Sequence, residues 1–247
     1  MRSSSKTAVR WYGHDRTLVI MAKAPRPGEV KTRLASSLSP EAVTDFYCCL
    51  LEDTLALARS LSVSPGDVEV AIMCPDSDAN QLAQLAGNEA SVVAQKGEGL
   101  AAGLTSVFAH FAEGQKRRVI AFNSDSPHLP RSVLEAAFET LDSHDVVVGP
   151  THDGGYYLVG ARASHPTLFA HDGMGTSSAL ERLLSRARTL KLSVGFAAPF
   201  YDIDVVDDLT RLAGELRLAP ARAPRTARWL KEWELVTAQS RTGTGEL

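Results

Sequence analysis

The sequence is poor in cysteine, has no long apolar run and carries almost no net charge, and each shortage excludes a class of protein. Its three cysteines, Cys48, Cys49 and Cys74, are too few for a disulfide framework and lack the usual spacing of a zinc site. No stretch reaches the roughly 18 apolar residues of a membrane helix, and the first residues lack the apolar core of a signal peptide. The 26 basic and 29 acidic residues give a formal net charge of -3, which leaves no global field to hold a polyanion such as DNA. We therefore expect a cytoplasmic protein that binds no nucleic acid and has no membrane span.

The rest of the composition is typical of a globular domain. The chain has 247 residues, 44% of them hydrophobic, and a mean hydropathy of -0.08. Residues 1–16 are rich in Ser, Arg and Lys without periodicity and predict a flexible leader, while residues 239–247 predict a frayed tail. No linker rich in Pro, Gly or Ser divides residues 17–238, which predicts a single domain with two sub-regions.

Short apolar runs alternate with longer amphipathic ones, which is the pattern of strands and helices around a mostly parallel sheet. Ser39, Pro40 and Glu41 supply an N-cap, a first-turn proline and a helix-favouring acid to the first long helix. Strands are expected at 17–24, 68–74, 91–95, 117–125, 145–150, 155–161 and 191–197, and helices at 40–61, from 98 onward, and at 177–187, 206–216 and 224–237. In such an α/β fold, with helices on both faces of the sheet, ligands bind at the carboxyl ends of the strands.

The loop after the first strand, MAKAPRPGEVKTRLA, is unusually basic. Its cations and turn-forming residues are Lys23, Arg26, Lys31, Arg33, Pro25, Pro27 and Gly28. Four cations at a strand end predict a site for a di- or triphosphate, held by lysine point charges and an arginine fork. The alternative is a solvated charged loop without a ligand.

The exit of the third strand contains two glycines and opens a helix directly. It reads Gln95-Lys96-Gly97-Glu98-Gly99-Leu100. Gly99 permits close approach of the backbone to a ligand, and the Gln95 amide can read a nucleobase edge because it both donates and accepts hydrogen bonds. Backbone N–H groups at the helix start, near Leu100, can satisfy polar ligand atoms. Turn geometry alone explains the glycines equally well.

Aspartates follow the fourth strand and recur late in the chain. Asp125 lies at the sheet edge before a rigid proline turn, a suitable position for Mg²⁺ or Mn²⁺, which take one or two carboxylates and complete their shell with phosphate oxygens and water. An Asx-Pro turn that caps the next helix is the alternative. Asp202 and Asp204 alternate along an extended segment, so they share one face and one of them could complete a metal site with Asp125. Asp207 and Asp208 are better explained as first-turn acids of a helix.

The segment between the fifth and sixth predicted strands allows two interpretations. Gly154 and Gly155 fit a tight hairpin turn. His152, Asp153 and Tyr156 lie beside that turn and equally fit the wall of a site for a polar substrate. The residues alone leave both interpretations open.

Four segments, together and in this order, carry a family resemblance over residues 17–235. They are AKAPRPGEVKTRL, SDSPHL, GPTHDGGYYLVG and DIDVVDDL, and they resemble the GT-A-like family of bacterial transferases described as nucleotide-diphospho-sugar or rSAM/arsenosugar-associated glycosyltransferases. The resemblance implies one α/β domain in which residues 17–125 bind the nucleotide and residues 126–238 bind the acceptor and a divalent metal.

The resemblance also implies roles for individual residues. Lys31 and Arg33 would meet phosphates, and Asp125 would take the metal position of the family. Asp204 would supply the second metal-binding carboxylate, with Asp202 as its rival. The chain departs from the family at His128, where members often carry an acid, and at Glu98-Gly99, where relatives tend to have an acid directly before Leu.

A second resemblance favours a different reaction. KTRL in the basic loop is similar to loops of 2-phospho-lactate guanylyltransferase and CMP-sugar synthetases. Gln95 with Gly99-Leu100-Ala101 resembles the base-reading segment of sugar-nucleotide pyrophosphorylases. Both fit nucleotidyl transfer, in which a triphosphate needs more cations around it than the diphosphate of a sugar nucleotide does.

The expected function is metal-dependent transfer of a glycosyl group from a nucleotide-diphospho-sugar to a small-molecule acceptor, with Mg²⁺ or Mn²⁺ as cofactor. The expected catalytic residues are Asp125, Asp153, Lys31 and Arg33, with Asp153 or His152 taking the acceptor's proton if the reaction inverts. The expected nucleotide-binding residues are Lys23, Pro25, Gly28, Lys31, Arg33, Gln95, Gly99 and Leu100, and the expected acceptor-binding residues are His128, His152, Asp153, Gly154, Gly155 and Tyr156.

Two alternatives stay open. The first is a nucleotidyltransferase that joins a nucleoside triphosphate to a phosphorylated or phosphonate molecule and releases pyrophosphate. The second is a nucleotide-binding module without catalysis, because a fold does not decide a function. The oligomeric state is also open to a homodimer: Trp229 and Trp233 share a helix face that covers either the sheet or a neighbouring subunit.

Overall fold

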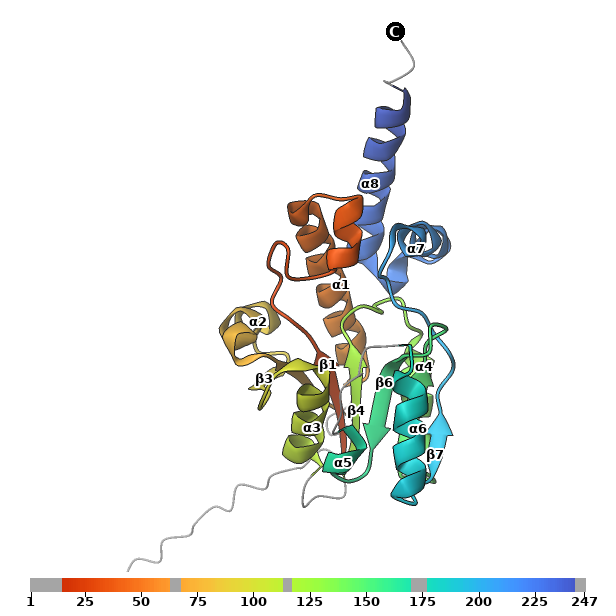
Figure 1. Ribbon diagram of the computed structural model, residues 1–247. Helices are drawn as coiled ribbons and strands as arrows, with labels where there is room; N and C mark the ends of the chain where they lie inside the picture. The colour runs from red at the N-terminus through yellow and green to blue at the C-terminus, as the bar shows by residue number, and fades with distance from the viewer. Residues whose placement is uncertain (1–14, 63–67, 113–116, 170–176, 243–247) are drawn as a thin grey trace, which may run out of the picture.

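The computed structural model describes residues 15–62, 68–112, 117–169 and 177–242, and within them it shows one mixed sheet flanked by helices (Figure 1). The seven strands of these residues pair in the order β3-β2-β1-β4-β6-β5-β7, and only β6 is antiparallel to its neighbours β4 and β5. The strands are β1 (Arg16–Met21), β2 (Glu69–Cys74), β3 (Ser91–Ala94), β4 (Arg118–Asn123), β5 (Val146–Pro150), β6 (Tyr156–Ala161) and β7 (Val194–Phe196). The predicted α/β fold with a mostly parallel sheet is confirmed.

Helices cover both faces of the sheet because alternate strand residues are apolar on each side. One face carries α1 (Pro40–Ser60), α2 (Ala79–Ala86) and α4 (Arg131–Thr140). The other, in front in Figure 1, carries α3 (Gly99–Phe111), α5 (Pro166–Phe169) and α6 (Ala179–Thr189). A third apolar cluster joins α1 to α7 (Val206–Leu218) and α8 (Pro224–Thr242) at the end toward which β1 and β4 point.

Short 3-10 helices complete the described structure. They are η1 (Thr32–Ser36), η2 (Asp76–Asp78) and η3 (Pro220–Arg222). Within the described ranges, no helix combines the length and apolar character that crossing a membrane would need.

Most predicted elements are present close to their predicted bounds. The Ser39 side chain caps α1 as predicted and accepts a hydrogen bond from the Ala42 backbone N–H at 3.2 Å. The last strand is shorter than predicted, because Lys191 takes a left-handed φ of 57° after α6 and β7 begins only at Val194. α8 continues to Thr242, so the first residues of the predicted tail are helical, and residues 1–14 of the predicted leader lie outside the described residues.

Candidate active site

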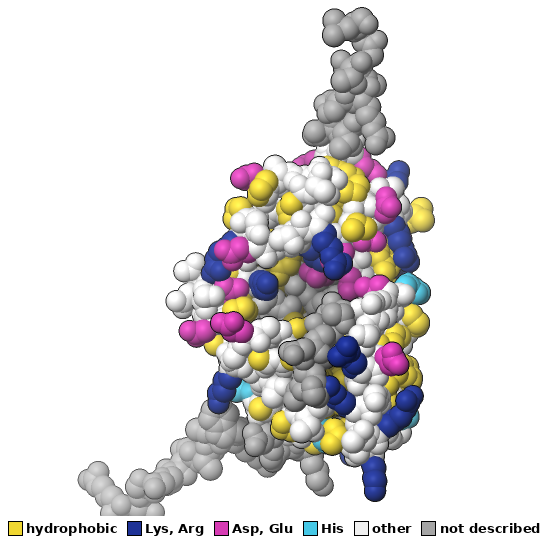
Figure 2. All heavy atoms as spheres, viewed as in Figure 1, with side chains coloured by type: hydrophobic (Ala, Val, Ile, Leu, Met, Phe, Trp, Pro, Cys, Tyr) yellow, Lys and Arg dark blue, Asp and Glu magenta, His cyan; other side chains and the backbone are white. Residues whose placement is uncertain are grey.

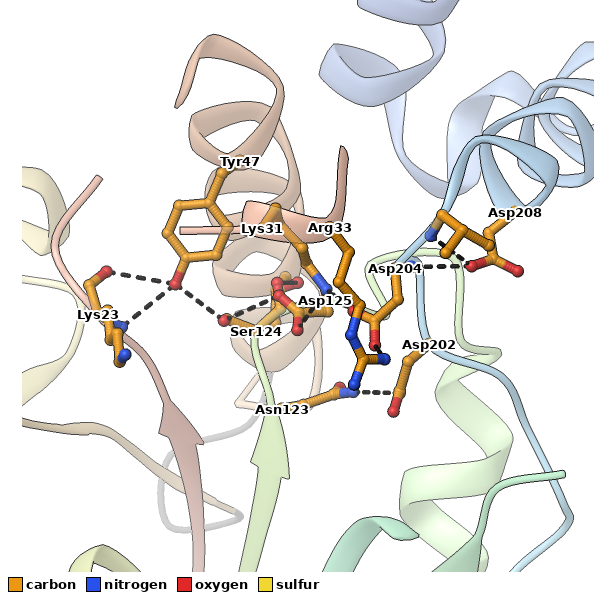
Figure 3. Close-up of polar contacts among 12 residues, drawn as sticks. Lys23, Lys31, Arg33, Tyr47, Asn123, Ser124, Asp125, Asp202, Asp204 and Asp208 are labelled. Carbon is orange, nitrogen blue, oxygen red and sulfur yellow. Dashed lines mark hydrogen bonds and ion pairs between the residues drawn. The ribbon is translucent and has the colours of Figure 1, made fainter. Parts of the chain in front are cut away.

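The loop after β1 turns Lys31 inward over the carboxyl ends of the central strands. Lys31 has φ 45° and ψ 42°, a left-handed conformation that costs a residue with a side chain of the order of 1–3 kcal/mol unless its surroundings enforce it. Its side chain is only 5% exposed, and its Nζ lies 2.7 Å from Oδ2 of Asp125 and 3.0 Å from Oδ1 of Asp204 (Figure 3). Two carboxylates hold this buried ammonium in place.

Three distant segments meet at this ammonium. Asp125 lies two residues after the end of β4. Asp204 lies just before α7, and its backbone N–H donates a hydrogen bond to the Asp208 carboxylate at 2.9 Å. Arg33, which is 68% exposed, donates from a terminal guanidinium nitrogen to Oδ2 of Asp204 at 3.0 Å. The structure therefore brings Lys31, Arg33, Asp125 and Asp204 together, as the basic loop and the strand-end aspartates predict.

Asp202 completes a carboxylate cluster with Asp125 and Asp204. Asn123 donates from Nδ2 to Oδ1 of Asp202 at 2.6 Å. Burial, reinforced by the Asp125 carboxylate, raises the pKa of Asp202 to about 7. Burial alone would lower the pKa of Lys31, but the attraction of Asp125 and Asp204 outweighs it and raises that pKa above its ordinary value. The cluster gathers three carboxylates around two cations, so ionisation of Asp202 leaves it with an excess of negative charge.

The donor set of this cluster fits a hard divalent cation that is shared with a ligand. Carboxylate oxygens are the ligands that Mg²⁺ and Mn²⁺ prefer, and the excess negative charge favours one further cation. Among the described residues, no three His, Cys, Asp or Glu side chains are grouped closely enough to hold a metal ion by themselves. An ion held by Asp125 and Asp204, with Asp202 nearby, would therefore take its remaining ligands from phosphate oxygens and water.

A cleft of about 950 Å³ opens beside the cluster, between the loop after β1 and the start of α3. Figure 2 shows Lys and Arg side chains and Asp and Glu side chains gathered around the hollow in the middle of this face. Residues from the predicted nucleotide site that line the cleft are Lys23, Lys31, Arg33, Gln95, Gly99 and Leu100. Its volume lies at the upper end of the usual range for small-molecule sites, which is enough for a nucleotide.

The glycine loop at the start of α3 is held by its own glutamine. Gln95 donates from Nε2 to the backbone oxygen of Gly97 at 2.9 Å and to that of Gly99 at 3.3 Å. Gly99 has a φ of 80°, a backbone conformation that residues with a Cβ atom rarely adopt. The Gln95 amide nitrogen thus contacts the loop while the residue lines the cleft, and its role in reading a base edge stays a prediction.

Two residues outside the predicted site fix the basic loop. Asp78 is buried, and its carboxylate accepts hydrogen bonds from the Ala24 backbone N–H at 2.9 Å and from Arg26 at 2.7 Å. Arg26 therefore supports the loop and is not available for phosphate. The Tyr47 hydroxyl accepts from the Lys23 backbone N–H at 3.2 Å and lies 3.0 Å from the hydroxyl of Ser124.

These two roles had only weak signals in the sequence. Tyr47 fits the apolar spacing of α1, and Asp78 fits a helix start. Neither pattern points to the ends of the strands, where their polar atoms are used.

The hairpin of β5 and β6 forms the wall opposite the cluster. Its turn carries Asp153, whose Oδ1 accepts hydrogen bonds from the Thr151 hydroxyl and from the Gly155 backbone N–H. These bonds, led by that of Thr151, lower the pKa of Asp153 and keep it ionised at neutral pH. Gly154 has a φ of 87°, and a Cβ there would lie 2.0 Å from the backbone oxygen of Ser177, so the turn needs glycine. Asp153, Gly155 and Tyr156 line a second cavity of about 320 Å³.

Several predicted site residues lie elsewhere. His128 is buried in the core against the rings of Phe200 and Tyr201, where no substrate in either cavity would touch it. His152 is exposed and lines neither cavity. Pro25, Gly28 and Gly154 shape their loops and line neither cavity.

Comparison with known proteins supports the resemblance that the motifs carry. Residues 57–176 match the model of a family described as an uncharacterized protein conserved in bacteria, DUF2064. That span includes the glycine loop, Asp125 and the hairpin, but neither the basic loop nor Asp204. No curated protein matches the sequence significantly.

Solved structures place the fold among nucleotide-dependent transferases. A Desulfovibrio desulfuricans protein, provisionally described as a nucleotide-diphospho-sugar transferase, has a TM-score of 0.81 at 25% identity and is matched over 98% of its length by 92% of this chain. A Methanothermobacter nucleotidyl transferase has a TM-score of 0.55 at 17% identity, with 83% of this chain and 100% of that one covered. The 4-diphosphocytidyl-2C-methyl-D-erythritol synthase of Anaerococcus prevotii has a TM-score of 0.53 at 12% identity, with 82% and 98% covered. The neighbours agree on a transferase fold that uses nucleotides and differ in the group transferred.

Proposed function

We propose that the protein is a divalent-metal-dependent glycosyltransferase, which moves a sugar from a nucleotide-diphospho-sugar to a small-molecule acceptor. The observation that carries the proposal is the Lys31 ammonium between Asp125 and Asp204, two carboxylates that line both a nucleotide-sized cleft and a smaller cavity. Two substrates that meet where the cleft and the cavity adjoin would react beside cations and carboxylates. The relative from Desulfovibrio desulfuricans supports the same class of reaction.

The number of available cations favours a diphosphate over a triphosphate. Of the four cations in the basic loop, Arg26 is bound to Asp78, and Lys31 and Arg33 already face the carboxylate cluster. Lys23 is exposed and makes no ion pair with a described residue. A triphosphate brings more negative charge than these residues can balance, whereas the diphosphate of a sugar nucleotide brings less.

The side chains then have distinct tasks. Lys31 and Arg33 bind the diphosphate and stabilise the negative charge that grows on it as the bond to the sugar breaks. Asp153 lines the smaller cavity as an ionised carboxylate and takes the proton of the attacking acceptor. Asp125 and Asp204 would hold the metal, which when bound supplies further positive charge to the leaving diphosphate.

The first test is binding, measured by thermal shift. The protein is melted with Mg²⁺ or Mn²⁺ and with UDP-, GDP-, TDP-, ADP- or CMP-sugars, or with each nucleoside triphosphate, at equal concentration. A ligand at about 100 times its Kd should raise the Tm by about 5–10 °C. Stabilisation by one diphospho-sugar and its diphosphate, with weak triphosphates, is the expected result. A preference for one triphosphate would favour nucleotidyl transfer, and no stabilisation by any nucleotide would contradict both reactions.

The second test is turnover by matched variants. Asp125→Asn should lower kcat at least about 100-fold, and Lys31→Ala combined with Arg33→Ala should remove donor-dependent stabilisation. Asp207→Asn makes the same change of charge at an exposed position that lines neither cavity, so its turnover should match that of the wild type. Full turnover by Asp125→Asn would contradict the proposed site.

A further inference from the structure

The smaller cavity adjoins the nucleotide cleft and shares Arg33, Asp125 and Asp204 with it. Its volume of about 320 Å³ equals roughly ten water molecules at ~30 Å³ each, near the lower limit for small-molecule sites. A compound no larger than a monosaccharide fits that space. In the proposed reaction the reacting end of the donor lies at the residues that both cavities share, so the smaller cavity is the position of the acceptor. The inference below therefore rests on the proposed function.

The charge on the cavity is strongly one-sided. Its described lining contains four carboxylates, those of Asp125, Asp153, Asp202 and Asp204, and a single cation, Arg33. The guanidinium of Arg33 already faces Asp204 at 3.0 Å. In the proposed reaction Lys31, Arg33 and the metal that Asp125 and Asp204 would hold face the donor diphosphate. A phosphate or carboxylate group on the acceptor would then meet the ionised Asp153 carboxylate without a free cation in the described lining, which disfavours its binding.

Apart from Asn123 and Thr151, the other side chains of the lining are mainly apolar or aromatic. They include Met21 of β1, Leu104 of α3, and Tyr156 and Val159 of the hairpin. Such a surface suits the C–H face of a hydroxylated compound, while carboxylate oxygens accept hydrogen bonds from its hydroxyl groups. Asp153 is suited to this role, because the hydrogen bonds from Thr151 and Gly155 both engage its Oδ1.

We propose that the acceptor is a small hydroxylated molecule that carries no anionic group. Its hydroxyl oxygen forms the new bond to the anomeric carbon of the donor sugar. The bond between that carbon and the diphosphate oxygen breaks, and the nucleoside diphosphate leaves with the electron pair. The hydroxyl proton passes to the Asp153 carboxylate. No oxidant, reductant or further reactant is required.

The test uses acceptor pairs that differ only in an anionic group. With the donor from the binding test at saturation, release of nucleoside diphosphate is measured with glycerol and glycerol 3-phosphate, with glucose and glucose 6-phosphate, and with glucose and glucuronate. We expect kcat/KM to be at least tenfold higher for the neutral member of each pair. Equal or better reaction of the anionic members would overturn the proposal.

Two further outcomes separate this proposal from the proposed function. If the donor binds and is slowly hydrolysed but no neutral hydroxyl compound speeds diphosphate release, only the acceptor assignment is overturned. If no sugar nucleotide stabilises the protein or is hydrolysed, the proposed function fails and the acceptor assignment fails with it.

A pair of variants tests whether the charge of the cavity causes the preference. Asp153→Asn removes one negative charge from the lining, so the ratio of neutral to anionic kcat/KM should fall at least threefold, although both rates decrease. Asp207→Asn, outside the cavity, should leave the ratio unchanged. An unchanged ratio in Asp153→Asn would contradict the electrostatic basis of the proposal.

Discussion

His128 is 0% exposed, and neither of its ring nitrogens has a hydrogen-bond partner among the described residues. Burial, reinforced by the positive charges of Arg211 and Arg222, lowers its pKa to about 3. The ring lies against Phe200 and Tyr201 and serves as an uncharged part of the core. From the sequence, His128 is expected among the acceptor-binding residues, but its side chain is buried and lines neither cavity.

This burial predicts that His128 makes the fold less stable in mild acid. In the unfolded chain the histidine pKa is about 6.5, so below that pH the unfolded state binds a proton that the folded state takes up only near pH 3. The contribution of His128 to the free energy of unfolding is fully present above about pH 6.5. Below that pH the free energy of unfolding falls by up to about 1.4 kcal/mol per pH unit, or about 2 kcal/mol by pH 5. Urea unfolding at pH 7, 6 and 5 should show this loss in the wild type.

The matching variants isolate the histidine from other titrating groups. His128→Phe keeps a ring of similar shape and should flatten the pH dependence by that amount. His110→Gln changes an exposed histidine and should leave the wild-type slope. Equal slopes in the wild type and His128→Phe would show that His128 is protonated in the folded protein.

Among the elements, local sequence determines which ones form but not how their side chains meet. α1 begins as predicted because its Ser39 cap and its apolar spacing are local signals. The 3-10 helix η1 was not predicted, because it depends on the left-handed backbone of Lys31, which distant carboxylates hold. Lys31 and Asp204 were both expected in the site, yet their 173-residue separation gave no sign that one would neutralise the other.

The position of Lys31 in the loop after β1 therefore leads us to expect that its ammonium and a metal ion compete for Asp125 and Asp204. The Lys31 ammonium lies between the oxygens of Asp125 and Asp204, where a divalent cation would bind. A metal alone must displace this like charge, whereas a bound diphosphate offers Lys31 another partner. Lys31→Met should therefore bind Mn²⁺ without nucleotide at least about tenfold more tightly than the wild type, a difference of about 1.4 kcal/mol.

Calorimetry or electron paramagnetic resonance of Mn²⁺ measures this affinity directly. Lys23→Met is the matched control, because it removes the same charge from the same loop at an exposed side chain away from the cluster. An equal gain in both variants would indicate a general effect of net charge. No gain in Lys31→Met would place the metal away from Asp125 and Asp204.

At the scale of the whole molecule, α1 joins the sheet to the last helices because it is buried on two sides. α1 packs Tyr47 and Leu51 against the sheet, while Phe46 and Leu50 face the cluster formed with α7 and α8. The first part of the chain thus depends on its last helices for the burial of α1. The aspartates before α7 reach the site because this packing fixes where α7 begins.

Asp53 makes that dependence specific. It is 1% exposed on α1, and its Oδ2 accepts hydrogen bonds from the Thr226 backbone N–H at 2.8 Å and from the Thr226 hydroxyl at 2.9 Å. A carboxylate at this position satisfies free N–H groups in the first turn of α8 and is favoured by the helix dipole. Phe46 and Trp229 add an aromatic contact between the two helices, with ring centroids 4.7 Å apart.

These contacts predict that the chain unfolds as one cooperative unit, with α8 included. In a Trp11→Phe variant the fluorescence comes from Trp229 and Trp233 of α8, whereas circular dichroism reports all helices. The two signals should share one urea midpoint. Asp53→Asn weakens a buried charged cap, so the free energy of unfolding obtained from either signal should fall by about 1–3 kcal/mol. Asp45→Asn, at an exposed site of α1, should change that free energy by no more than about 0.5 kcal/mol. If Asp53→Asn moved only the fluorescence transition, α8 would be a separate unit, and the position of Asp204 could not depend on the packing of α1 against the final helices.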